Sequence, residues 1–597
     1  MKLRASCGYF LVFALWSIIC QTSAFGIDYA IRPIVMAGEH LTGMDEGLFV
    51  GGAGGSMTGG FPATFAPNGD IISPVSLVEA AEPSPYVGYG VWRFPSNGEP
   101  LPYSLPVVDW GVAARAVDSQ TTYVQTEYPV GGRSRERLFA FDGDTPTEIA
   151  NTIDPLPGVS LPINYLSQIR ANDSVLAFGG QLATQGVPTK HGVWTRRNGV
   201  VAPVAITGQA APGFPTNAPF DEVILNGVFH DGDVLFFAEV TYSGDRSRDW
   251  GIYRSNGVAI QPLLVGRQAT PQPELTFGVS YLNASNGRGD FVFASRLLGP
   301  GADYTNEETI WSYRDGEMRM LARESYQPLG TEPRTVYRDF YEVSINDAGT
   351  IAFRAETYHP TFGVRSTIFH SVGEDDPAAL LQVGDLIEGS RVTRIYEPRL
   401  AANGDVAFEV GLANGSFTAR GVVLYSQVAR SLALIREGDA LLLAPGDERT
   451  IDDIRLNGFD VMGERTPAPD GSALLNVRFT DSTSGLFLSQ PVFVPGDLNF
   501  DGAVNTGDVA AFASQFGREL GDLPHAADLN SDGSVNLYDL VMLRSHLTPA
   551  VQSATAVPEP SAAIFVLAAA AGLLGAWFWS GRRTGSEVRQ VRQARGA

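Results

Sequence analysis

A pattern that recurs about every 57 residues constrains the fold of this chain more than any other feature. Its first landmark is a polar turn followed by an aromatic residue, most complete in Asn346-Asp-Ala-Gly349-Thr-Ile-Ala-Phe353. Looser copies place the turn at Gly69, Ser119, Ser174, Gly232, Gly289, Gly404 and Gly471. Each copy holds roughly four short strand-like runs separated by polar turns, so we expect one four-stranded sheet per copy.

Two further landmarks recur. An aromatic residue after an aliphatic one follows each turn by about twenty residues, at Trp92, Phe139, Trp194, Tyr253, Trp311, Phe369, Tyr425 and Phe487. A short apolar run that ends in Gly comes next, as in residues 203–208 and 381–384. We interpret the Gly and aromatic positions as turn and core positions rather than as a ligand site.

These repeats predict a mainly β chain with an eight-bladed β-propeller over residues 25–494, seven blades being the alternative. Solenoid coils are usually shorter, and tandem sandwiches need about 100 residues each. Residues 32–39 look like an extra third landmark placed before the first copy. We therefore expect Ile34, Val35 and Met36 to supply a strand to the last copy and close the ring, which removes exposed sheet edges.

The complete string at residues 346–353 resembles the NxxGxxAF tandem repeat of bacterial surface proteins. That family carries no established activity, so the resemblance implies a surface protein and assigns no chemistry to the propeller.

Two acidic twelve-residue loops begin 31 residues apart, at Asp497 and Asp528. Oxygen ligands at positions 1, 3, 5, 7, 9 and 12, with Gly at position 6 for the sharp turn, suit a hard cation such as Ca²⁺. The expected ligands are Asp497, Asn499, Asp501, Ala503, Asn505 and Asp508 in the first loop and Asp528, Asn530, Asp532, Ser534, Asn536 and Asp539 in the second. We predict two Ca²⁺ ions per chain, with Val504 and Val535 packed together between the loops.

One apolar helical pattern follows each loop. It comprises Val509, Phe512 and Phe516 after the first loop and Leu540, Leu543 and Leu547 after the second. This duplicated EF-hand-like unit, with Asp at position 12, resembles the type I dockerin module over residues 495–548. The resemblance implies Ca²⁺-dependent folding and docking to a cohesin-like partner through loop positions 10 and 11 and the following helix.

The two halves differ at those docking positions, which read Thr506-Gly507 in the first and Leu537-Tyr538 in the second. This difference argues against two interchangeable docking modes. The alternative role for Ca²⁺ is stabilisation alone, because a module of about 55 residues seldom buries a sufficient core unaided.

The N-terminal residues 1–24 predict a secretory signal peptide. Lys2 and Arg4 precede an apolar run, and Thr22-Ser-Ala24 provides a cleavage site. A lipoprotein signal at Cys20 fits less well because Ile19 is bulky. Both cysteines, Cys7 and Cys20, lie in this segment, so we expect no disulfide in the mature protein.

The C-terminal end predicts membrane attachment. A linker at residues 549–561 contains Pro558-Glu-Pro560, an apolar run covers residues 562–580, and a basic tail covers residues 581–597. The run is long enough for a transmembrane helix with its Arg-rich end in the cytoplasm. The combination resembles the PEP-CTERM sorting signal, which implies cleavage by an exosortase-like enzyme and delivery to the cell surface or extracellular matrix. A plain membrane anchor is the alternative.

The acidic composition excludes nucleic acid as a partner, because a formal charge of −23 repels phosphate. No GxSxG or HExxH motif is present. Arg288-Gly-Asp290 is an adhesion-type tripeptide, but it falls on the repeated turn. We therefore expect a non-catalytic, exported protein whose propeller binds a surface polysaccharide or protein. The alternative is a dockerin-bearing glycoside hydrolase or lyase, which would require two or three carboxylates converging near the ring's centre.

Overall fold

A computed structural model of the chain describes residues 28–41, 44, 48–53, 63–66, 70–79, 86–95, 99–103, 111–117, 121–130, 133–142, 145–183, 190–214, 218–241, 248–414, 417–444, 446–457, 471–492, 496–498, 504–517, 527–529 and 534–547. The chain divides into two compact units, Met1–Phe493 and Val494–Ala597. Within the described residues, no helix is long and apolar enough to cross a membrane. Residues 1–24 and 549–597, on which the targeting predictions rest, lie outside the described residues.

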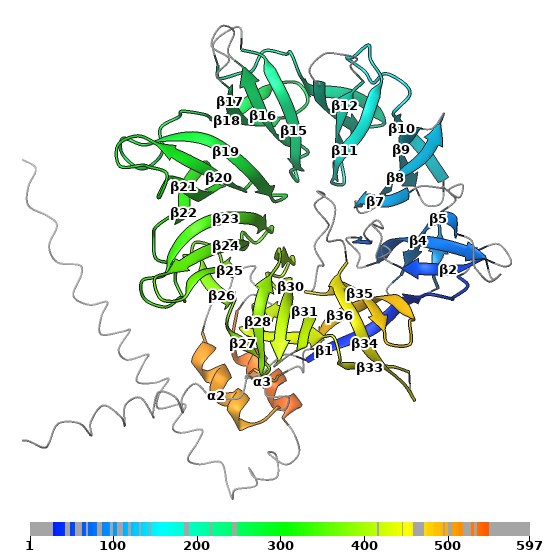
Figure 1. Ribbon diagram of the computed structural model, residues 1–597, viewed down its shortest axis with the longest axis vertical. Coiled ribbons are helices and arrows are strands. Elements are labelled where there is room, and N and C mark those ends of the chain that lie inside the picture. Colours follow the sequence, from blue (N-terminus) through cyan, green and yellow to red (C-terminus); the bar gives the residue numbers. More distant parts are fainter. Residues whose placement is uncertain are drawn as a thin grey trace, which may run out of the picture. The chain divides into compact units, whose positions relative to one another are not determined.

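The first unit is a ring of eight antiparallel sheets that follow one another along the chain (Figure 1). The first four blades contain β2 (Leu48–Ala53), β3 (Thr64–Phe65), β4 (Ile71–Glu79), β5 (Tyr86–Phe94) and β6 (Leu101–Pro102); β7 (Gly111–Val117), β8 (Thr121–Val130), β9 (Arg133–Asp142) and β10 (Thr145–Asn151); β11 (Ile163–Ala171), β12 (Val175–Leu182), β13 (Lys190–Arg197) and β14 (Val200–Ile206); and β15 (Phe220–Val228), β16 (Val234–Thr241), β17 (Arg248–Ser255) and β18 (Ile260–Val265).

The last four blades continue the pattern. They contain β19 (Thr276–Ser285), β20 (Phe291–Leu298), β21 (Glu308–Arg314) and β22 (Glu317–Arg323); β23 (Val336–Ile345), β24 (Ile351–His359), β25 (Gly363–Ser371) and β26 (Ala378–Gln382); β27 (Leu386–Ile387), β28 (Ser390–Ile395), β29 (Arg399–Leu400), β30 (Val406–Asn414), β31 (Phe417–Ser426) and β32 (Ser431–Arg436); and β33 (Ala440–Ala444), β34 (Asp447–Leu456), β35 (Ala473–Phe479), β36 (Ser484–Val492) and β1 (Asp28–Met36). The prediction of an eight-bladed, mainly β propeller is confirmed.

The sequence landmarks fall at equivalent places in the blades. Gly232 and Gly349 lie between the first and second strands of their blades, where φ values of +86° and +75° favour glycine. Trp194, Tyr253 and Trp311 lie in third strands and are at most 1% exposed. The repeat therefore records one turn and one core position per blade.

The N-terminal strand closes the ring. β1 pairs antiparallel with β36 in the last blade, with Val35 opposite Leu486 and Met36 opposite Gly485. Val35 is fully buried among residues of the last and first blades, including Leu486 and Trp92. The predicted closing strand is thus confirmed, and pairing across the chain ends covers the edge of β36 that would otherwise be open.

The hydrophobic core lies between neighbouring sheets rather than at the centre of the ring. A cluster of buried side chains occupies every junction between consecutive blades, the last and first included. Between blades 3 and 4, for example, Val193 and Ala205 pack with Phe220 and Phe236. Face-to-face packing of sheets excludes water from both surfaces, so each blade is stabilised by its two neighbours.

The third landmark forms a backbone latch between blades. After the outermost strand, Gly208 donates its N–H to the carbonyl of Phe220 at 2.8 Å, and the Phe220 N–H returns to the Gln209 carbonyl at 2.8 Å. The same reciprocal pair joins Gly38 and Glu39 to Val50 across the ring closure. The apolar run that ends in Gly is therefore an outer strand followed by its attachment to the next blade.

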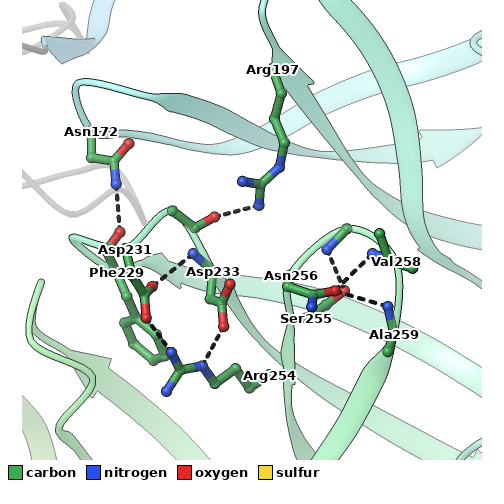
Figure 2. Close-up of polar contacts among 12 residues, drawn as sticks. Asn172, Arg197, Phe229, Asp231, Asp233, Arg254, Ser255, Asn256, Val258 and Ala259 are labelled. Atoms are coloured by element: carbon green, nitrogen blue, oxygen red, sulfur yellow. Dashed lines mark hydrogen bonds and ion pairs between the residues drawn. The ribbon is translucent and has the colours of Figure 1, made fainter.

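Polar side chains connect the turns between first and second strands, as Figure 2 shows for blades 3 and 4. The Asn172 side chain accepts hydrogen bonds from its own turn and donates one to the Phe229 carbonyl of the next blade. Arg197 of blade 3 donates to the carbonyl of Gly232, which lies in the same blade 4 turn as Phe229. Asn346 likewise donates to the Ala401 carbonyl at 2.9 Å. The Asn of the repeated turn thus stabilises its own loop and fixes the adjacent blade.

Candidate metal centre

The second unit contains two ten-residue helices, α2 (Thr506–Gln515) and α3 (Leu537–His546), each directly after a predicted cation loop. Asn505 and Asn536 are the N-caps, and their side chains accept from Gly507 and Tyr538 N–H at 2.7 and 2.8 Å. Loop position 9 is thus also the helix cap, which sets the angle at which the loop enters the helix.

The position 12 aspartates are the most buried polar groups of this unit. Asp508 and Asp539 are both fully buried. Asp508 accepts the Leu498 N–H at 2.6 Å and the Asn505 N–H at 2.7 Å, so one carboxylate holds both ends of the loop. Asp539 accepts the Asn536 N–H at 2.8 Å. Each helix therefore begins with a capping box in which Asp replaces the usual Glu or Gln.

The described ligand positions are compatible with a hard cation. Asp497 is only 7% exposed, and the N–H of the residue after it, Leu498, donates to the buried Asp508. Buried anions require a compensating positive charge. Of the predicted ligands, the structure also describes Asn505, Asp528, Ser534, Asn536 and Asp539, whereas Asn499, Asp501, Ala503, Asn530 and Asp532 lie outside the described residues. Within the described part of the chain, no group of three acidic, His or Cys side chains forms a complete cation site.

The two halves share a small core. Val504 and Val535 pack together with Phe512, Ala527 and Leu543. The Gly517 N–H also donates to the Val535 carbonyl at 2.8 Å. This bears out the expected packing of the position 8 valines, whereas Phe516 of the predicted apolar stripe is 50% exposed.

The outer faces of the two helices differ. On α3, four apolar side chains are exposed: Leu537 by 65%, Tyr538 by 75%, Val541 by 68% and Met542 by 37%. The equivalent positions of α2, 31 residues earlier, are the small residues Thr506, Gly507, Ala510 and Ala511. The module thus presents an apolar face on α3, which we call the α3 face, and a small-residue face on α2.

Two acidic side chains of neighbouring blades, Glu342 and Glu397, influence each other electrostatically. Glu342 is on β23, and Glu397 lies between β28 and β29 in the next blade. Burial, followed by the charge of Glu342 and a hydrogen bond with it, raises the pKa of Glu397. Glu342 pairs with Arg354 at 3.1 Å, and Glu397 pairs with Arg399 at 3.6 Å. Each of these two carboxylates therefore has its own arginine partner.

The adhesion-type tripeptide is not displayed for recognition. Asn286 accepts hydrogen bonds from the N–H groups of Arg288, Gly289 and Asp290. Asp290 is 7% exposed and lies 3.5 Å from Arg314. The Asp290 carboxylate therefore stabilises the turn between β19 and β20 through its contacts with Asn286 and Arg314.

Comparison with known proteins identifies parts of both units. Residues 124–388 match a family of unknown function (DUF7453), and residues 495–548 match the dockerin type I domain. No curated protein matches the chain.

Similar solved structures include three proteins at low identity. The β-propeller domain of the Trilobed protease from Pyrococcus furiosus is 9% identical, covering 63% of this chain and 94% of that one with a TM-score of 0.33. Polysaccharide lyase Uly1 is also 9% identical, covering 78% and 98% with a TM-score of 0.33. A post-proline cleaving enzyme from Rickettsia typhi is 10% identical, covering 71% and 58% with a TM-score of 0.35. At these values no activity transfers to this chain.

The match identifies residues 495–548 as a dockerin type I domain, which follows an eight-bladed β-propeller in the same chain.

Proposed function

We propose that this protein is a non-catalytic, exported surface or extracellular-matrix protein. Its dockerin domain attaches the chain to a cohesin-like partner in a Ca²⁺-dependent manner, and its propeller binds a polysaccharide or protein ligand. The α3 face is the observation that carries this proposal, because four exposed apolar side chains on one short helix form a surface that a partner would cover.

The proposal includes one Ca²⁺ in each loop, held by the twelve residues predicted from the sequence. Bound Ca²⁺ would add positive charge beside the buried carboxylates of Asp497, Asp508 and Asp539. This chain's own residues then orient the docking surface, because Asp508 and Asp539 join each loop to the first turn of its helix.

Docking is expected to use α3 in a single orientation. The side chains of Leu537, Tyr538 and Val541 offer apolar area that Thr506, Gly507 and Ala510 lack at the equivalent positions of α2. Aromatic and aliphatic anchors at the centre of an interface usually contribute most of the binding free energy.

Binding of cohesin modules from the same genome to the full chain tests this assignment, measured by surface plasmon resonance with and without Ca²⁺. Tyr538→Ala/Val541→Ala is expected to weaken binding at least tenfold, whereas the matched α2 variant Thr506→Ala/Ala510→Ser leaves it unchanged. Equal losses from both variants would refute the single orientation. Binding that persists in EDTA would refute Ca²⁺-dependent docking.

For localisation, we propose export through the signal peptide at residues 1–24 and retention through residues 557–597. Cleavage at the Pro-Glu-Pro motif by an exosortase-like enzyme would release the chain from the transmembrane helix proposed at residues 562–580. Mass spectrometry of the protein recovered from the cell surface distinguishes sorting from a plain membrane anchor, because only sorting removes the C-terminal peptide.

The enzyme alternative is less well supported by the geometry. Glu342 and Glu397 are each paired with an arginine, so neither carboxylate is free for acid–base work. Release of reducing sugar or unsaturated product from a polysaccharide panel, lost in Glu342→Gln and Glu397→Gln variants, would establish catalysis and overturn the binding-only function.

A further inference from the structure

Four exposed aromatic side chains lie at one edge of blades 5 and 6. Tyr304, Tyr326, Tyr358 and Phe362 are exposed by 85%, 50%, 44% and 51%. Tyr304 lies between β20 and β21, Tyr326 lies between β22 and β23, and the other two belong to the β24–β25 hairpin. Because successive strands run antiparallel, these three connections emerge at the same edge of the ring. We call these four side chains the aromatic surface.

Hydrogen bonds join the three connections into one surface. The Ser325 hydroxyl donates to the Thr305 carbonyl at 2.6 Å, which holds the loop of Tyr326 against that of Tyr304. The His359 Nε2 atom contacts the Pro333 carbonyl at 3.2 Å, which holds the β24–β25 hairpin against the same middle loop. The aromatic residues thus belong to neighbouring loops that are tied together.

The backbone beneath the rings is preorganised. Asn306 and Asp303 close the turn around Tyr304 with two hydrogen bonds of 3.0 Å. The Tyr326 carbonyl accepts the Tyr337 N–H at 3.0 Å as part of the latch between blades 5 and 6. A large exposed ring on ordered backbone gains little from folding, but it can bind a ligand with a small loss of conformational entropy.

Polar groups accompany the rings. The Arg365 guanidinium lies 4.3 Å from the Phe362 ring centre and donates to Glu332 Oε1 at 3.1 Å. The other oxygen of Glu332 is buried and has no hydrogen-bond partner among the described residues. Arg323 lies over one face of the Tyr326 ring, 5.4 Å from its centre. Beside the exposed rings the surface therefore has an ion pair, between Arg365 and Glu332, and the buried guanidinium of Arg323 behind Tyr326.

These features select the chemistry of the ligand. Aromatic faces carry negative charge density that attracts the C–H groups of a sugar ring, and carboxylate or guanidinium groups suit its hydroxyls. Carboxylates beside the rings, together with the formal charge of −23, disfavour an anionic polymer. An amphipathic helix would need a continuous aliphatic groove, whereas the exposed aliphatic side chains nearest in sequence to these aromatics are the separate residues Leu298, Leu329 and Val364.

We propose that the aromatic surface binds an uncharged polysaccharide, with Tyr304 and Tyr326 stacking on sugar rings. Phe362 is held between Arg365 and His359, whose ring lies 4.6 Å away, so it contributes an apolar edge. This assignment rests on the proposed ligand-binding function of the propeller and adds its location and ligand class.

Affinity electrophoresis of the full chain tests this inference in native gels that contain hydroxyethylcellulose, galactomannan or the anionic polygalacturonate. The variant Tyr304→Ala/Tyr326→Ala removes two exposed rings. Tyr165→Ala is the matched control, because Tyr165 is 46% exposed on β11 of another blade. Tryptophan fluorescence confirms that each variant is folded, and cohesin binding is measured on the same preparations.

We expect an uncharged polymer to retard the wild-type chain. The retardation should be at least tenfold weaker for Tyr304→Ala/Tyr326→Ala and unchanged for Tyr165→Ala. It should also persist in EDTA, because the aromatic surface is independent of the Ca²⁺ loops. Equal retardation of the double variant, retardation only by polygalacturonate, or none by any polymer would overturn the inference. If polysaccharide retardation fails but cohesin binding remains, only the polysaccharide proposal is refuted. If cohesin binding fails but retardation is as expected, only dockerin-mediated attachment is refuted.

Discussion

His370 provides a quantitative test of how tightly neighbouring blades pack. Its side chain is 7% exposed on β25, and its Nε2 atom contacts the Gly404 carbonyl of the next blade at 3.2 Å. Burial lowers the pKa of His370 from 6.5 to about 4. Below pH 6.5 the unfolded chain binds a proton that the folded chain does not accept until near pH 4, so the free energy of unfolding falls as the pH drops through this interval.

The expected magnitude follows from these two pKa values. At pH 4.5 the unfolded state is almost fully protonated at this position and the folded state is mostly neutral, which lowers the free energy of unfolding by about 2.5 kcal/mol relative to pH 7. His370→Phe keeps a ring against Tyr425, 5.2 Å away, but removes the titrating group. The variant is expected to be about 1 kcal/mol less stable at pH 7, because the hydrogen bond to Gly404 is lost, and to lack the His370 contribution to the pH dependence.

Urea unfolding followed by tryptophan fluorescence measures this effect, because Trp194, Trp250 and Trp311 are buried in the propeller. Burial also raises the pKa of Glu397 and Glu409, which gives an opposite trend with pH in both proteins and cancels in the comparison. Phe408→Leu is the control, because Phe408 is fully buried in the core between blades 6 and 7 and does not titrate. It should lower the free energy of unfolding equally at pH 4.5 and pH 7. Parallel pH profiles for the wild type and His370→Phe would refute the reasoning.

Three other perturbations have defined outcomes. Chelation with EGTA should unfold residues 495–548, because the buried Asp508 and Asp539 belong to the predicted Ca²⁺ loops. Tryptophan fluorescence of the propeller should stay constant. Simultaneous unfolding of the propeller and of residues 495–548 would contradict this prediction. Deleting residues 28–40 removes β1 and should lower the propeller's melting temperature and promote aggregation through β36, so unchanged melting and light scattering would argue against ring closure. Gly208→Ala should lower the free energy of unfolding in urea by about 1 kcal/mol, because the backbone there has a φ of +96°, which strains any residue with a Cβ. The added Cβ would meet no atom within 4 Å, so backbone strain is the whole expected cost. An unchanged urea midpoint would show that the latch tolerates a side chain.

Several features could be predicted from local sequence because they repeat. Each blade carries its own alternating pattern and turn, so the landmarks at Gly232 and Trp194 predicted the number of sheets and part of the core. The extra landmark at Val35 predicted the closing strand for the same reason. The role of Asn346 in joining blades was missed, although its recurrence with Asn286 was visible, because its donor reaches Ala401 in the next blade.

The sequence by itself determined the kinds of unit in this protein, because a propeller blade and a cation loop are each specified by residues within a short segment. Only the tertiary structure decided which distant residues meet. Asn346 bonds to Ala401 of the next blade, and Tyr304 and Tyr326 share an edge because Ser325 reaches Thr305. The exposure of the α3 face was decided in the same way, since burying Leu543 against Val504 leaves Tyr538 on the outside of the helix. Such contacts depend on how whole sheets and helices pack, which no local pattern encodes.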